Sequence, residues 1–445
     1  MKKIIGGFFC VLFLLLAAML PVHGEELELY AGAAVLMDAD SGRVLYGKNE
    51  DAVMAMASTT KIMTCIVVLE TVSQDDILTV SAYAASMPKV KLYIQKGEQY
   101  TVRDLLHSLM LESHNDAAVA LAEYVGKQFL PRELQEKDTS EYTAEESKMA
   151  MAVFAAQMNR KAAELGCVNT WFITPNGLDA TEAFTGEDGS AVQKEHCTTA
   201  RELARILAYC IRESPCRAAF LEITRTDSYH FSSNGRSYSC VNHNAFLGMM
   251  EGALTGKTGF TNKAGYCYVG ALERDGRIFV VALLACGWPN NKTYKWSDTR
   301  KLMQYGVDNY FYRSFSEEGI AFDESRLNPI PVLNGQTAKL GADASVAVRV
   351  AGRGADGGDS GAAEAGENGK NLEGLLMRTD ETVSVKYTLA ESLTAPVAEG
   401  TPVGSVVYMV DDKICRTETI VTADGIGAVD PEWCLKQILD RFLLP

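Results

Sequence analysis

Three stretches follow one another along the chain: Ser58-Thr59-Thr60-Lys61, Ser113-His114-Asn115 and Lys257-Thr258-Gly259. Each alone is weak evidence, because a motif of three or four residues occurs by chance in many chains of this length. Together, and in this order, they supply a serine nucleophile, a lysine base, a second serine that can relay a proton, and a cationic site for an anion. The ordered set therefore predicts one active site assembled from three distant segments.

The beginning of the chain indicates export. Lys2 and Lys3 precede an apolar run over residues 4–20, and residues 22–24 offer a cleavage position. This pattern predicts a secretory signal peptide over residues 1–24. An uncleaved membrane anchor is the alternative, because the apolar run is nearly long enough to span a bilayer. In both cases we expect an extracytoplasmic protein, either secreted, in the cell wall or on the outer face of the cytoplasmic membrane.

The composition predicts a folded, acidic protein. Of the 445 residues, 47% are hydrophobic and 22% are charged, which is ordinary for a globular protein and excludes wholesale disorder. This length, less the leader, suggests two domains. The formal net charge is −15 and falls to about −17 when the two lysines of the leader are removed. We therefore expect no nucleic-acid partner, since that binding needs a basic face to neutralise phosphates.

The eleven cysteines leave two interpretations open. Cys10 lies in the leader, and the ten that remain are an even number in an exported protein, which is compatible with disulfides. Several, such as Cys65 and Cys210, lie within apolar runs, as buried free thiols do. We expect free thiols, with Cys210 and Cys216 as the pair if a disulfide forms. No spacing of Cys and His residues resembles a metal site, so we expect no metal and no cofactor.

Residues 25–315 show strands, then helices, then strands, which predicts an α+β layer arrangement. Alternating apolar residues around the turn Asp40-Ser41-Gly42 predict a hairpin over 33–46. The other expected elements are helices from about Ser58, at two places over 101–125, and over 149–165, 199–211 and 297–312, an irregular surface insertion over 127–148, and strands over 267–272 and 277–286.

The last part of the chain has a different character. Short β-rich segments between Gly and Pro turns predict a β-rich domain over residues 316–429. Within it, residues 352–370 have too little apolar character to order themselves, which predicts a flexible loop. Residues 430–445 have the pattern of a short amphipathic helix that is too short to cross a bilayer. This helix either lies on the membrane surface or caps the β domain, and its acidic excess leaves both possibilities open.

Ser58 and Lys61 have the spacing of a nucleophile and its base. Side chains three positions apart share one face of a helix, so Lys61 can reach Ser58 if a helix begins near Ser58. Only a neutral amine accepts a proton, and burial together with the nearby charge of Lys257 would disfavour the ammonium form. Ser113 would then pass the proton to the leaving amine, and Asn115 would bind the substrate amide or Lys61.

The third stretch predicts where a substrate would be held. Lys257 offers a charge and Thr258 a hydroxyl, which together suit a carboxylate. The backbone N–H groups of Ser58 and Phe260 would stabilise the oxyanion that forms during attack on a carbonyl group. These features predict that a substrate with a free carboxylate transfers its acyl group to a serine.

The chain resembles the low-molecular-mass penicillin-binding proteins, which are serine-type D-alanyl-D-alanine carboxypeptidases. The likeness covers about residues 30–315 closely and the β domain more loosely. The stretches that carry it are 57–64, 112–118, 174–179, 196–201, 257–261 and 264–266.

The resemblance implies a penicillin-binding and β-lactamase-like α/β/α layered catalytic domain, followed by a small all-β domain. It implies removal of the terminal D-alanine from peptidoglycan pentapeptide stems through an acyl-serine, as a part of cell-wall remodelling, with covalent trapping by β-lactams. It also implies substrate contacts for Gly259 and for His243, which stands where the family often has an arginine. Lys295 occupies the second such position, and residues 254–256 also depart from the family pattern, so fine specificity is left open.

Two other functions compete with the carboxypeptidase. A β-lactamase needs a deacylating water, usually positioned by a glutamate on a loop, and we identify no such glutamate in the sequence. A catalytically silent wall-binding protein could keep the same fold, but the intact Ser58, Lys61, Ser113 and Lys257 argue against it. We therefore expect a carboxypeptidase.

Overall fold

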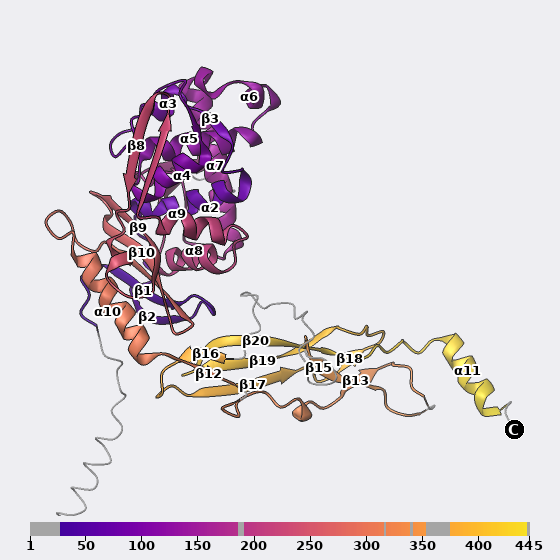
Figure 1. Ribbon diagram of the computed structural model, residues 1–445. Coiled ribbons are helices and arrows are strands. Elements are labelled where there is room, and N and C mark those ends of the chain that lie inside the picture. Colours follow the sequence, from indigo (N-terminus) through magenta and orange to yellow (C-terminus); the bar gives the residue numbers. More distant parts are fainter. Residues whose placement is uncertain (1–26, 186–190, 316, 339–340, 353–373, 443–445) are drawn as a thin grey trace, which may run out of the picture.

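The computed structural model describes residues 27–185, 191–315, 317–338, 341–352 and 374–442. Figure 1 shows helices around a sheet, followed by an elongated group of strands with a helix at its far end. The predicted signal peptide and nearly all of the predicted flexible loop lie outside the described residues.

A five-stranded antiparallel sheet in the order β2-β1-β11-β10-β9 is the frame of the first part. The predicted hairpin near residue 40 joins β1 to β2, and a second tight turn joins β10 to β11. The strands are β1 (Ala33–Asp38), β2 (Val44–Lys48), β9 (Ala253–Thr261), β10 (Gly265–Arg274) and β11 (Arg277–Leu284).

Alternate residues of this sheet enter two different cores. On β1, Val35 lies in the core that includes α8 (Ala200–Arg212), whereas Leu36 lies in the core that includes α10 (Tyr294–Asn309). Successive side chains of a strand point to opposite faces, so all six residues of β1 are buried only because both faces are covered. Helices therefore lie on both sides of the sheet, which confirms the predicted α+β class and α/β/α layering.

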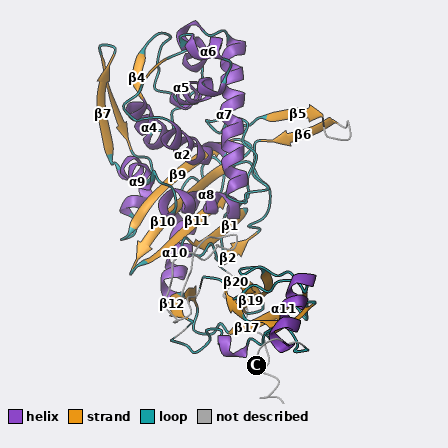
Figure 2. Ribbon diagram, turned by 90° about the vertical axis from the view of Figure 1, so that its right-hand side faces the viewer, coloured by secondary structure: helices purple, strands orange, loops and turns teal. Residues whose placement is uncertain are grey.

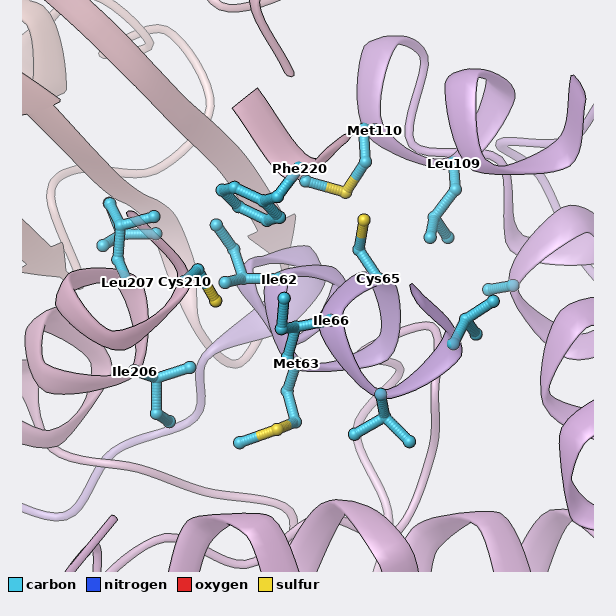
Figure 3. Close-up of a cluster of buried hydrophobic side chains, with 14 of the residues drawn as sticks. Ile62, Met63, Cys65, Ile66, Leu109, Met110, Ile206, Leu207, Cys210 and Phe220 are labelled. Atoms are coloured by element: carbon cyan, nitrogen blue, oxygen red, sulfur yellow. The ribbon is translucent and has the colours of Figure 1, made fainter. Parts of the chain in front are cut away.

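The helix α2 (Lys61–Thr71) lies at the centre of the helical region. Residues 61–69 are all buried, and Figure 3 shows Ile62, Cys65 and Ile66 among side chains of the surrounding helices. A helix that is buried all round must be enclosed from every side, so its position is fixed by packing. The other helices of this region are α4 (Val102–Leu111), α5 (Asn115–Gly126), α7 (Ala144–Glu164) and α9 (Arg217–Arg225).

Two predicted boundaries are wrong. The insertion over 127–148 is largely helical, and α7 begins at Ala144 because Thr143 and Glu146 form a capping box in which each side chain accepts the other's backbone N–H. The expected helix over 297–312 ends at Asn309 and is followed by a strand, β12 (Phe311–Ser314). The short helices of the insertion are η2 (Lys127–Phe129), α6 (Arg132–Glu136) and η3 (Thr139–Glu141).

Several small elements connect the larger ones. Figure 2 shows one of them, the hairpin β5–β6, projecting from the side of the helical region. These elements are η1 (Ala57–Thr60), β3 (Ile77–Thr79), α3 (Ala82–Ala85), β4 (Gln99–Thr101), β5 (Thr181–Thr185), β6 (Ala191–Glu195), β7 (Ser228–Ser233), β8 (Arg236–Val241) and η4 (Ala245–Gly248).

The second part is built from strands around its own apolar core. A four-stranded sheet in the order β15-β20-β19-β17 packs with a three-stranded sheet in the order β14-β13-β18, and Val406, Tyr408 and Ile420 are buried between them. The elements are η5 (Glu324–Arg326), β13 (Ile330–Leu333), β14 (Ser345–Val346), β15 (Val348–Val350), β16 (Gly374–Met377), β17 (Val383–Leu389), β18 (Leu393–Thr394), β19 (Pro402–Val410) and β20 (Lys413–Thr422).

Arg43 joins the two parts. Its guanidinium donates to the carbonyl O of Leu376 at 2.5 Å and to the Oε1 of Glu381 at 2.6 Å. The Glu381 side chain is only 7% exposed, so this ion pair is largely removed from water. Arg43 also bonds to Leu376 of β16, and β16 pairs with β12, the strand that follows α10. The connection between the two parts is therefore made by both side-chain and backbone hydrogen bonds.

The last helix of the described residues is α11 (Pro431–Phe442), and several of its apolar side chains are exposed. Leu435, Ile438 and Leu439 are 57%, 51% and 42% exposed, so these three side chains are not packed against the β domain. Within the described residues, no helix has the length and apolar character needed to span a membrane.

The ten cysteines of the described residues are all free, and Cys65 and Cys210 are buried. Cys210 and Cys216, the pair expected if a disulfide formed, are not bonded to each other. In the part of the chain that the structure covers, no cluster of His, Cys, Asp or Glu residues could hold a metal ion.

The enclosed position of α2 makes a stability prediction. Ile66→Ala should lower the free energy of unfolding by about 2–5 kcal/mol, because it removes a fully buried side chain and leaves a cavity. Ile77→Ala is the matched control, since Ile77 is 62% exposed and its loss should change stability by no more than about 0.5 kcal/mol. Urea unfolding of both variants measures the difference, and equal losses would show that α2 is not enclosed as described.

Candidate active site

A short 3-10 turn brings Ser58 and Lys61 together. Ser58 lies on η1, which leads directly into α2, and Lys61 is the first residue of α2. The Lys61 Nζ lies 2.9 Å from the Ser58 Oγ, within hydrogen-bond range. Ser58 is half-buried and Lys61 is fully buried, so the lysine meets the serine from the interior of the protein.

Burial controls the protonation of Lys61. The amine lies 3.0 Å from the Oδ1 of Asn115 and donates to the carbonyl O of Asn176 at 2.5 Å. Burial lowers the pKa of Lys61 well below its ordinary value and the charge of Lys257 lowers it further, while Asp116 opposes the shift. Desolvation and a neighbouring cation both disfavour an ammonium, so this amine is suited to accept a proton.

Two glycines allow other segments to approach the backbone at Ala57 and Ser58. A Cβ on Gly259 would lie 2.9 Å from the backbone N of Ser58, so β9 passes the serine more closely than a side chain would permit. A Cβ on Gly177 would lie 2.1 Å from the carbonyl O of Ala57, and Gly177 has a φ of +81°. Both positions require glycine, one for close approach and the other for close approach and conformation.

Strand β9 carries the cationic part of the site. Lys257 is buried, and its Nζ donates to the carbonyl O of Thr258 at 3.0 Å. Burial lowers the pKa of Lys257 to about 7. A bound carboxylate would raise this pKa again, because a nearby opposite charge favours the ammonium. Thr258 is half-buried and Phe260 is exposed, so the strand also presents a hydroxyl and a ring.

Ser113 lies in the turn between α4 and α5, and Asn115 follows it at the start of α5. Ser113 has a φ of +65°, and its Oγ is buried without a hydrogen-bond partner among the described residues. A buried hydroxyl without a hydrogen-bond partner is unfavourable. A ligand that bonds to the Ser113 Oγ would remove this cost, so the hydroxyl is available for such a contact. Asn115 begins α5, and its backbone N–H donates to the carbonyl O of Val90 at 2.8 Å.

His243 and Lys295, the two residues at positions where the family often has arginines, have contacts outside β9. The His243 side chain is 58% exposed, with its Nε2 3.7 Å from an oxygen of Glu112, and its backbone N–H donates to the carbonyl O of Leu111 at 3.1 Å. Lys295 is buried and donates to the carbonyl O of Lys292 at 2.5 Å. Within the described residues, neither forms a hydrogen bond or ion pair with β9.

Two residues that support the site were not identified from the sequence. Asn176 contributes its backbone carbonyl to Lys61, and such a contact leaves no signal in the residue type. Asp116 accepts the backbone N–H groups of Leu92 and Tyr93 at 2.9 and 2.8 Å, which fixes the loop before α4 against the start of α5. The sequence shows that Asp116 is an acidic residue in the first turn of a helix, where it favours the helix N-terminus. It does not show which distant backbone groups this carboxylate accepts from.

A family profile described as D-alanyl-D-alanine carboxypeptidase matches residues 21–129 and 144–285, more than half of the chain. The chain belongs to this family. A second profile, the C-terminal domain of penicillin-binding protein 5, matches residues 378–427 in the β-rich part. The sequence prediction of a low-molecular-mass penicillin-binding protein with serine-type carboxypeptidase activity on peptidoglycan is thereby confirmed.

Individual relatives agree with the family. The chain is 27% identical to the D-alanyl-D-alanine carboxypeptidase DacF of Bacillus subtilis over 292 residues, 64% of this chain and 64% of that protein. It is 27% identical to DacA of Haemophilus influenzae over 412 residues, 90% of this chain and 86% of that protein. The crystal structure of penicillin binding protein 5 from Haemophilus influenzae superposes with a TM-score of 0.62 at 23% identity, over 91% of this chain and 100% of that one, which shows the fold.

We predict that the second-order rate constant of acylation by benzylpenicillin, which reports the ionisation of the unliganded protein, has a bell-shaped dependence on pH. At low pH Lys61 is protonated and cannot accept the proton of Ser58, so the rate constant falls. The pKa of Lys61, which lies well below its ordinary value, sets the position of this acid limb. Rising pH discharges Lys257 near its pKa of about 7, which weakens attraction of the ligand carboxylate and produces the alkaline limb. Stopped-flow acylation across the pH range measures both limbs.

Lys257→Arg separates the two groups. A guanidinium keeps its charge throughout the alkaline range, so the alkaline limb should move upward by at least about one pH unit while the acid limb stays. An alkaline limb that does not move in this variant would show that another group produces it.

Proposed function

We propose that this chain removes the terminal D-alanine from peptidoglycan pentapeptide stems by acylating Ser58. The observation that carries the proposal is the 2.9 Å contact between the Lys61 Nζ and the Ser58 Oγ, made by an amine whose pKa is lowered by burial and by the charge of Lys257. A serine is a poor nucleophile until a base takes its proton, and this arrangement supplies that base at hydrogen-bond distance.

In the proposed reaction, Lys61 accepts the proton of Ser58 as the Oγ attacks the carbonyl carbon of the penultimate D-alanine. The C–N bond to the terminal D-alanine then breaks, and Ser113 passes the proton from Lys61 to the leaving amine. Water then attacks the acyl carbon while Lys61 accepts its proton, the bond to the Ser58 Oγ breaks, and Lys61 returns the proton to that Oγ. Asn115, whose Oδ1 lies 3.0 Å from the Lys61 Nζ, holds the base in place or binds the substrate amide.

The terminal carboxylate of the substrate would be bound by Lys257 and Thr258. Oxyanion stabilisation would come from the backbone N–H groups of Ser58 and Phe260, which donate where negative charge develops in the transition state. Gly259 supports this role, since its lack of a Cβ lets β9 approach the backbone N of Ser58. A substrate contact of the exposed His243 would lie at the outer rim of this site.

β-Lactams would enter the same site, because they also offer a carbonyl carbon for attack and a carboxylate for Lys257. The resulting acyl-serine would persist, unlike the intermediate formed with a peptide. A β-lactamase would instead hydrolyse this adduct rapidly, and a silent wall-binding protein would not form it. The lifetime of the adduct therefore distinguishes the three functions.

We further infer that the protein acts outside the cytoplasmic membrane and that α11 contacts the membrane surface. The exposed Leu435, Ile438 and Leu439 would insert at the boundary between headgroups and acyl chains, which removes their apolar area from water. We place the catalytic domain at residues 25–315 and the β-rich domain at 316–429, so the β-rich domain separates this helix from the active site.

Ser58→Ala should abolish both D-alanine release from a pentapeptide and covalent labelling by a fluorescent penicillin, because no other group takes the place of the missing Oγ. Mass spectrometry after incubation with benzylpenicillin should show one long-lived adduct on the wild-type protein and none on the variant. A labelled variant would place the nucleophile elsewhere. Rapid turnover of penicillin by the wild type would favour a β-lactamase, and an unlabelled wild type would favour the wall-binding protein.

Removing α11 should weaken peripheral membrane binding. A chain that ends at residue 429 should sediment with anionic lipid vesicles several-fold less than the chain with α11, because it lacks the exposed apolar face. Penicillin labelling of the same samples is the control, since the truncation leaves the catalytic residues intact. Equal sedimentation of both chains would exclude α11 as the membrane contact.

A further inference from the structure

His196 is a buried side chain that touches two segments of the site. The residue is 3% exposed and follows β6. Its Nε2 lies 2.8 Å from the Oγ1 of Thr60 on η1. Its Nδ1 lies 3.0 Å from the backbone N of Ile173 and 3.4 Å from that of Thr174. One imidazole thus links the turn before α2 to a loop more than 100 residues away in sequence.

The neighbours of the ring fix its tautomer. Backbone N–H groups only donate, so the Nδ1 that faces two of them accepts and carries no proton. The ring proton therefore lies on Nε2 and is donated to Thr60, whose hydroxyl donates in turn to the carbonyl O of Ala57 at 2.8 Å. Burial, and to a lesser extent the charge of Lys61, lowers the pKa of His196 to about 3, so the ring is neutral near pH 7.

Both ends of this hydrogen-bonded chain lie next to the reacting groups. At one end, Ala57 directly precedes Ser58 and has a φ of +48°, a conformation that needs external support in a residue other than glycine. At the other end, the loop that begins at Ile173 leads to Asn176, whose carbonyl accepts from the Lys61 Nζ at 2.5 Å. Within the described residues, His196 makes no hydrogen bond to Ser58 or Lys61, so its influence is indirect.

We infer that His196 is a positioning residue for acylation, which holds the turn that carries Ser58 in register with the loop that presents the Asn176 carbonyl to Lys61. This inference rests on the proposed roles of Ser58 and Lys61. Proton transfer and attack need the reacting atoms in line, and a displacement of about 1 Å costs on the order of 100-fold in rate. The imidazole bonds both segments at once, with an acceptor on one side and a donor on the other.

His196→Phe tests the inference, since it fills a similar volume without either hydrogen bond. Stopped-flow acylation by benzylpenicillin should show the first-order acylation step slowed by about 10- to 100-fold, with the preceding non-covalent dissociation constant changed by less than about threefold. His196→Asn keeps an acceptor near Nδ1 and His196→Gln keeps a donor near Nε2, so each should recover part of the rate. His230→Phe, at an exposed position of β7, is the matched control and should react as the wild type does.

A double-mutant cycle with Thr60→Val distinguishes positioning from general weakening of the fold. Because His196 acts through Thr60 on one side, the double variant should be slowed less than the product of the two single effects. Fully multiplicative effects, or wild-type acylation in a folded His196→Phe protein, would overturn the inference. If His196→Phe does not fold, wild-type rates in both Thr60→Val and His196→Asn would overturn it, and slowed rates in both would support it.

The same experiments separate this inference from the proposed function. A wild-type protein that is not acylated at Ser58 would contradict the proposed function itself. A wild type that is acylated at Ser58, together with an unaffected His196→Phe variant of unchanged melting temperature, would contradict only the positioning role.

Discussion

The catalytic part of this protein depends on a primary amine that is kept out of water beside a serine. An isolated ammonium in a protein interior is unfavourable by several kcal/mol, so full burial of Lys61 pushes the amine toward its neutral form. The same burial would leave the amine without hydrogen bonds unless other groups met it. Asn115 and Asn176 provide these hydrogen bonds from segments about 60 residues apart in sequence. The hydrogen-bonding needs of one buried amine therefore bring the two segments together.

Packing keeps that point in place. Because α2 is buried all round from its first residue, Lys61 cannot turn outward without opening the core. The sheet contributes from the other side, where Gly259 allows β9 to lie against the backbone of Ser58. Ser58 is therefore held between a buried helix and a strand that already lies against its backbone.

The features that could be predicted from the sequence are those set by neighbouring residues. The hairpin near residue 40 follows from local turn chemistry, and the approach of Lys61 to Ser58 follows from their spacing in a helical turn. Lys257 and Thr258, predicted to bind a carboxylate, lie on β9 next to Gly259, which approaches the backbone of Ser58. Contacts made by backbone atoms over long distances could not be predicted. The Asn176 carbonyl is one such contact, and the exposed position of His243 depends on how a loop packs rather than on its residue type.

The ion pair between Arg43 and Glu381 has a mechanical consequence. Arg43 directly precedes β2, at the edge of the central sheet, and Glu381 belongs to the elongated β-rich part, with both side chains mostly shielded from solvent. Together with the pairing of β12 and β16, it makes the connection stiff rather than a free hinge. The β-rich part is thus attached to the central sheet by side-chain and backbone hydrogen bonds, so the direction in which Ser58 faces is tied to the orientation of the β-rich part.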